Sequence, residues 1–167
     1  MTHSKTEEEI EERVVKMRDG AKEVVRFPCE NKTGLVKPML CFDAQALALS
    51  FLPEEDGGRG YTYHHLRRDV YDLAVKTGVE VESRYVVPSA HVTLGRFVDE
   101  ADFETEGKLD GGKVGCFVEE IERVNEWLKR EFWEGRNAMR WVVGDDGPME
   151  LRRGTVWYGG GETVSLD

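Results

Sequence analysis

A histidine and a threonine two residues apart are the side chains of this sequence best suited to chemistry. His91 and Thr93 lie within the segment 84–97, which is rich in strand-forming residues. Because residues i and i+2 of a strand point to the same face, both side chains are expected to project together. An imidazole moves protons near neutral pH, and a hydroxyl can donate to a phosphate oxygen. The pair favours phosphoryl chemistry, although His-x-Thr alone also fits an ordinary solvated strand face.

The same alternation predicts the environment of the neighbouring side chains. Val92 and Leu94 should point away from His91 and into a core. Arg96 is also out of phase with His91, so a structural salt bridge is expected for it rather than a phosphate contact.

Three further residues are candidates for substrate binding: Tyr85, Ser89 and Tyr63. Tyrosine rings can stack on a nucleic-acid base, and so can the ring of Phe42. The alternative for each of these rings is packing in the core or between lobes.

The remaining histidines and the cysteines favour structural roles. His3 lies near the terminus, where catalytic geometry is hard to hold, while His64 and His65 begin an expected helix and suit capping or surface positions. Three widely spaced cysteines are present, and no two of them form a Cys-x-x-Cys pair that could bind zinc. They are expected to be buried thiols: Cys29, Cys41 and Cys116. No metal site and no cofactor are expected.

Composition restricts the classes of partner. The 167 residues are 40% hydrophobic and 34% charged, which suits one α+β domain over 1–167. A formal net charge of -10 disfavours binding of duplex DNA, whereas a local pocket for a nucleotide or RNA end stays open. The polar N-terminus and the lack of a long apolar run predict no membrane association and a cytoplasmic or nuclear protein.

Hydrophobic spacing predicts helices alternating with antiparallel strands. The first helix should begin at a capping box near Ser4 or Thr6 and end at Gly20. The other expected elements are a hairpin over 35–52 turning at 43–45, a helix over 65–77, strands over 84–88 and 90–98, an acidic loop over 99–110, a helix from 114 that ends by 135, and a closing hairpin of 139–144 with 149–158.

The motif and its setting resemble the two-histidine (2H) phosphoesterase superfamily, which includes 2′-5′ RNA ligase-like proteins and RNA 2′,3′-cyclic phosphodiesterases. The residues that match are Pro88, His91, Thr93, Leu94 and Arg96. The strand 46–51 and the helix 65–77 precede the motif in the order that the family has. The resemblance covers roughly residues 37–97.

The resemblance implies two lobes of antiparallel sheet with flanking helices, related by a pseudo-twofold axis. It also implies metal-independent hydrolysis or transfer at 2′,3′-cyclic or 2′-5′ phosphodiesters of nucleotides or RNA ends. One histidine would act as base and the other as acid, with the hydroxyls holding the phosphate. On this resemblance His91 is one acid/base and Thr93 is one phosphate donor.

One departure from the family pattern changes the expected activity. A first His-x-Thr should precede the first helix, but only Met1, Thr2 and His3 lie ahead of it, so Met1 is expected to follow a missing strand. Activity should then be impaired, since one positioned acid or base contributes about 10²- to 10⁴-fold in rate. The alternative is a non-catalytic phosphate-binding or scaffold module on the same fold. A missing strand would also leave a sheet edge open to self-association.

Overall fold

The computed structural model describes residues 6–55, 60–81, 90–154 and 161–166. These residues form an α+β fold with three α-helices and antiparallel strands, as the sequence predicts. The chain divides into two compact units: unit 1 comprises 1–34, 55–88 and 142–167, and unit 2 comprises 35–54 and 89–141. None of the described helices combines the length and apolar character that a membrane span requires.

The first helix, α1, begins as the sequence predicts but ends ten residues later. It spans Glu7–Glu30, and the predicted capping box is formed by Thr6 and Glu9. The expected end at Gly20 is wrong, because an apolar face continues beyond it. The buried residues of that face are Ala21, Val24, Val25 and Pro28. Burial of this face outweighs the modest helix penalty of one glycine.

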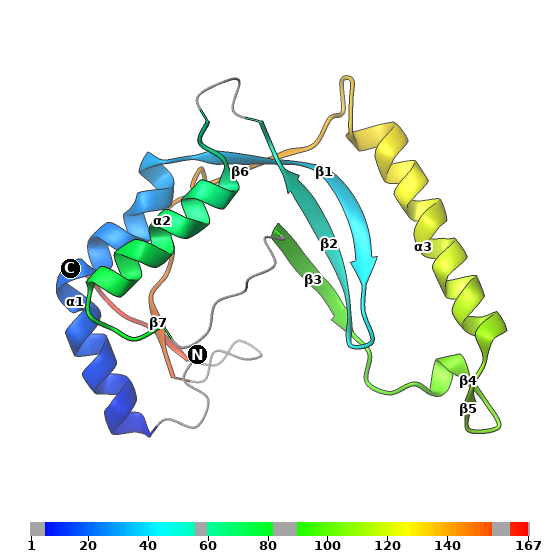
Figure 1. Cartoon of the computed structure of the whole chain (residues 1–167), viewed down its shortest axis with the longest axis horizontal. Coiled ribbons are helices and arrows are strands. Elements are labelled where there is room, and N and C mark those ends of the chain that lie inside the picture. The colour runs from blue at the N-terminus through cyan, green and yellow to red at the C-terminus, as the bar shows by residue number, and fades with distance from the viewer. Residues whose placement is uncertain (1–5, 56–59, 82–89, 155–160, 167) are drawn as a thin grey trace. The chain divides into compact units, whose positions relative to one another are not determined.

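Gly20 has a packing role instead of a terminating one. Helix α2 spans Tyr63–Lys76, as predicted, and lies beside α1 in unit 1 (Figure 1). A Cβ atom at Gly20 would lie 2.7 Å from Cγ2 of Thr77, the residue that caps the C-terminus of α2. The missing side chain therefore allows the two helices to approach closely.

The main sheet contains the predicted hairpin. Strands β1 (Thr33–Phe42) and β2 (Ala46–Pro53) pair antiparallel, and β3 (Ala90–Arg96) pairs antiparallel with β2. With β6 (Arg140–Val143), the strand order is β3-β2-β1-β6. The β1–β2 register shifts between Val36 and Met39, which marks a bulge in β1.

Helix α3 (Gly111–Phe132) is attached to β1 by side chains that bond to the strand backbone. The Asn125 amide accepts from the Leu40 N–H at 2.7 Å and donates to the Leu40 carbonyl at 3.0 Å. Just after the helix, Trp133 Nε1 donates to the Pro38 carbonyl at 2.9 Å. Figure 1 shows α3 running alongside β1. Three backbone groups of β1 are thus satisfied by side chains rather than by a strand.

An aromatic cluster packs the end of this unit. Its members meet edge to face, with ring centroids 5.0 to 5.9 Å apart, and come from β1, the segment after β3, the 3₁₀ helix Ala101–Phe103 and α3: Phe42, Phe97, Phe103 and Phe117. The acidic segment expected as a loop is therefore partly ordered, since it also holds the short hairpin of β4 (Glu104–Thr105) and β5 (Lys108–Leu109).

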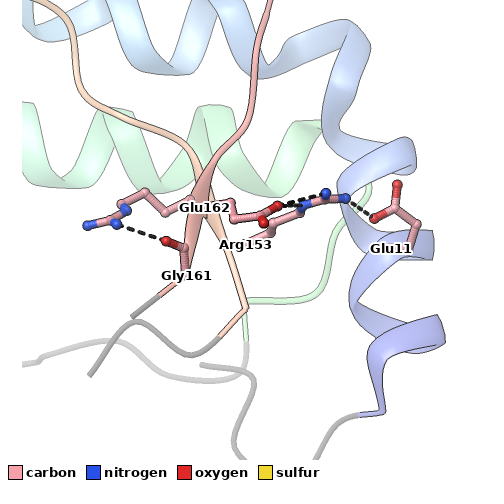
Figure 2. Close-up of polar contacts among 5 residues, drawn as sticks. Glu11, Arg153, Gly161 and Glu162 are labelled. Carbon is pink, nitrogen blue, oxygen red and sulfur yellow. Dashed lines mark hydrogen bonds and ion pairs between the residues drawn. The ribbon is translucent and has the colours of Figure 1, made fainter. Parts of the chain in front are cut away.

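The predicted closing hairpin does not form among the described residues, and positions 155–158 of its second strand lie outside them. Strand β6 joins the main sheet, while β7 (Arg152–Arg153) pairs with β8 (Glu162–Thr163). Figure 2 shows Arg153 between the carboxylates of Glu11 and Glu162. The two ion pairs measure 2.7 Å to Glu11 of α1 and 2.9 Å to Glu162. These two acids raise the pKa of Arg153, chiefly through hydrogen bonds. Long-range pairing of this kind leaves no short-range signal in the sequence.

Replacing Asn125 with alanine should destabilise the protein by roughly 1–3 kcal/mol, because the Leu40 N–H and carbonyl both lose their partner. Urea unfolding monitored by circular dichroism measures this change. The control is Glu126→Ala, at an exposed neighbour on the same helix, which should change stability little. Equal stability of Asn125→Ala and Glu126→Ala would contradict the structural role of Asn125.

Gly144→Ala should lower the stability by more than the cost of placing an alanine at a positive φ. Gly144 has φ +90°, and an added Cβ would overlap the carbonyl of Pro28 in α1. The matched control is Gly135→Ala, because Gly135 has φ +81° with open space around it and should lose only about 1–2 kcal/mol. Thermal unfolding of both variants separates the steric clash with Pro28 from the backbone strain. Similar losses of stability in the two variants would contradict the close approach of Gly144 to the Pro28 carbonyl.

Candidate functional site

His91 and Thr93 lie on β3 as predicted, in a strand and exposed. In the register with β2, His91 is directly opposite Ser50, and Thr93 is directly opposite Ala48. Opposed residues of an antiparallel pair share a face, and so do residues i and i+2. The imidazole, the Thr93 hydroxyl and the Ser50 hydroxyl therefore belong to one face of the sheet.

The backbone pattern brings the His91 and Ser50 side chains close together. Leu40 directs its N–H and carbonyl to Asn125, away from β2, so the Leu40–Leu49 pair is a non-hydrogen-bonded pair. Alternation makes His91–Ser50 a non-hydrogen-bonded pair as well, the type in which Cα atoms are only about 4.5 Å apart. The Ser50 hydroxyl is thus a neighbour of the imidazole.

Ser50 is the site residue that the sequence reasoning missed. The segment 46–51 was predicted as a strand, but its pairing partner was not, and only the register places Ser50 against His91. The same face continues onto β1, where Met39 lies opposite Ser50 and the exposed Cys41 lies opposite Ala48. A row of three residues, His91, Ser50 and Met39, therefore crosses the three strands.

The predicted burial of Val92 and Leu94 is wrong. Their side chains are 44% and 55% exposed, and in β3 only Ala90 is buried. The register with β2 shifts at this point, so Leu94 has no partner in the β2–β3 register. Strand β3 is the last strand in the order of the described sheet, and α3 bonds to β1, two strands away. The apolar side chains of β3 are therefore less buried than strict alternation predicts.

An aspartate fixes the hairpin turn that sets the position of β2. The Asp43 carboxylate accepts from the N–H groups of Gln45 and Ala46, at 2.7 and 2.9 Å. These two bonds lower the pKa of Asp43, with a smaller contribution from the charge of Arg96. The charge of Arg96 therefore also acts on the carboxylate of this turn.

The other predicted residues lie in unit 1 or outside the described chain. His65 caps α2, with Nδ1 accepting from the Thr62 N–H at 3.1 Å, and His64 is exposed, as the capping and surface interpretation predicts. Tyr63 is the half-buried first residue of α2, beneath the Arg67 guanidinium at 5.9 Å. Tyr85, Ser89 and His3 fall outside the described residues, and so does the expected strand 84–88.

The chemistry available on this face is that of one proton-transfer group beside two hydroxyls. His91 can give or take a proton, and the Thr93 and Ser50 hydroxyls can donate to an anionic oxygen. Within the described part of unit 2, His91 is the sole histidine. No group of three or more metal-binding side chains occurs among the residues described.

No protein-family model matches the chain, and no curated protein or solved structure matches it either.

The lowered pKa of Asp43 predicts an acid-dependent loss of stability. A depressed folded-state pKa stabilises the protein above the ordinary value of about 3.9, and this contribution disappears as pH falls through the folded-state pKa. The difference in unfolding free energy between wild type and Asp43→Asn should therefore be largest above about pH 5 and shrink toward about pH 3. Urea unfolding midpoints measured across this pH range test this expectation, and Asp146→Asn, at an exposed aspartate, is the control. A difference between wild type and Asp43→Asn that stays constant with pH would show that the Asp43 charge does not stabilise the turn.

Proposed function

We propose that this chain binds 2′,3′-cyclic or 2′-5′ phosphodiesters of nucleotides or RNA ends on the face that carries His91, Thr93 and Ser50, as a two-histidine phosphoesterase-like domain. The two-lobed, pseudo-twofold arrangement that the family resemblance implies is part of the same proposal. No cofactor takes part in it.

One observation carries the proposal: an exposed imidazole and two hydroxyls share one sheet face, with Ser50 directly opposite His91. A phosphodiester offers two non-bridging oxygens that share one negative charge and can accept from hydroxyl donors. One of its bridging oxygens needs a proton when the bond to phosphorus breaks. The three side chains supply these functions from rigid strands rather than from loops, which favours a fixed geometry.

The proposed reaction on a cyclic phosphate is hydrolysis. A water oxygen bonds to phosphorus, the bond from phosphorus to one ribose oxygen breaks, one proton leaves the water, and one proton reaches the ribose oxygen. His91 can carry out one of these two transfers. Efficient turnover requires a second proton-transfer group, and the sequence contains only one His-x-Thr. Turnover by this chain should be about 10²- to 10⁴-fold below that of a complete pair.

The single motif also supports the alternative of a non-catalytic phosphate-binding or scaffold module. The two proposals predict the same binding face and differ only in turnover.

Replacing His91 with alanine should weaken binding of a 2′,3′-cyclic mononucleotide roughly 10- to 100-fold, the loss expected for a hydrogen bond to a charged group. Residual hydrolysis should disappear with it. Calorimetry and product analysis measure both effects. The matched control is His64→Ala, because His64 is exposed on α2. Thr93→Ala should weaken binding up to about 10-fold, and Thr93→Ser should retain it.

The outcomes separate the two proposals. Hydrolysis that depends on His91 supports the enzyme, and binding without hydrolysis supports the module. An affinity that is the same in wild type, His91→Ala and His64→Ala would exclude both, as would the absence of any binding.

A further inference from the structure

The sheet face that carries His91 is divided into a polar half and an apolar half. His91 and Thr93 lie on β3, the last strand in the order of the described sheet. Ser50 of β2 forms the boundary, because it is opposite His91 on one side and opposite Met39 of β1 on the other. Beyond it the same face carries side chains without a charge or a hydroxyl, which we call the apolar surface: Met39 and Cys41 of β1, and Ala48 and Leu52 of β2.

The apolar surface is open to solvent, whereas the other face of the same strands is packed. Leu52 is 44% exposed, but Phe51, which alternates with it and points to the other face, is only 6% exposed. Cys41 is exposed because its neighbour Phe42 takes the packed face, against α3. The predicted burial of the Cys41 thiol is therefore wrong. Small-molecule sites combine an apolar lining with a few polar groups that fix orientation, and this face offers both.

A nucleotide whose phosphate binds at His91 brings its base over the apolar surface. In a 2′,3′-cyclic nucleotide the base is attached to the ribose carbon next to the one that carries the 2′-oxygen, so base and phosphate are one sugar ring apart. Neighbouring strands are about 4.8 Å apart, which places β2 one such spacing from β3 and β1 two spacings away. Among the described strands, the sheet continues from β3 only in this direction. The base therefore reaches Ala48 first and the side chains of β1 next.

We propose that the base of the bound nucleotide lies on the apolar surface, against the sulfur atoms of Met39 and Cys41. This inference rests on the proposed function and specifies its ligand as a nucleotide bound through its base as well as its phosphate. A thioether sulfur makes favourable contacts with aromatic rings, and the flexible methionine side chain adapts to rings of different size. Hydrogen bonds distinguish one base from another, and the apolar surface has no strong donor or acceptor. Affinity should therefore depend on the presence of a base and little on its identity.

The first test compares two ligands of the full chain by calorimetry: a 2′,3′-cyclic mononucleotide and methyl riboside 2,3-cyclic phosphate, which lacks the base. Wild type should bind the nucleotide more tightly. Met39→Ala should weaken nucleotide binding roughly 2- to 10-fold, the strength of a sulfur–aromatic contact, and leave binding of the base-free ligand unchanged. The matched control is Met139→Ala, because Met139 is 40% exposed and lies outside β1, β2 and β3. This control should change neither affinity.

The second test needs no substitution. Cys41 on β1 and Cys116 on α3 are both exposed, so each can be alkylated by iodoacetamide in the folded protein. A saturating cyclic mononucleotide should slow alkylation of Cys41 several-fold and leave that of Cys116 unchanged. The base-free ligand at saturation should protect Cys41 less. Mass spectrometry of the alkylated peptides measures both rates in one sample.

The outcomes distinguish this inference from the proposed function. Equal affinity of wild type for the two ligands, or no protection of Cys41 by the nucleotide, would overturn the inference; binding that still depends on His91 would leave the proposed function intact. Unreactive Cys41 in the ligand-free protein would also overturn it, because another segment or a second copy would then cover the apolar surface. Protection of Cys41 with an affinity that His91→Ala does not change would uphold the base contact and refute the proposed function. Absence of any nucleotide binding would overturn both.

Discussion

The pairing of the Asn125 amide with both backbone groups of Leu40 is the contact on which the geometry of unit 2 depends. A side-chain amide carries both N–H donors and a carbonyl acceptor, so it can bond to the N–H and the carbonyl of one strand residue as a neighbouring strand would. This pairing attaches α3 to β1. It also sets which β1 residues turn their backbone groups toward β2. Through alternation it sets the type of the β2–β3 pairs from Ala48–Thr93 to Phe51–Ala90, where the register is regular.

The polarity of the sheet follows from this arrangement. On one face, Phe42 packs against Phe117 of α3 within the aromatic cluster. The opposite face carries His91, Thr93, Ser50 and Cys41. A one-residue slip between β2 and β3 would exchange the two faces, so the register is a condition for the proposed site as much as for the core. The Asp43 turn, which joins β1 to β2, fixes the start of β2 at the hairpin end.

The proposed phosphate contact acts at short range. His91 and the two hydroxyls meet only in the observed pairing of β2 and β3. In a chain of net charge -10, long-range attraction does not favour an anion, so binding must come from such local donors.

The sequence determined what depends on neighbours along the chain. The Thr6 cap, the hairpin turn at Asp43, helices α2 and α3, and the shared face of His91 and Thr93 all follow from spacings of a few residues. Only tertiary structure decided the extension of α1 beyond Gly20, the separation of β6 from β7, the exposure of Leu94, and the placement of Ser50. These features depend on which distant segments pair or pack, and hydrophobic periodicity carries no information about the identity of a partner.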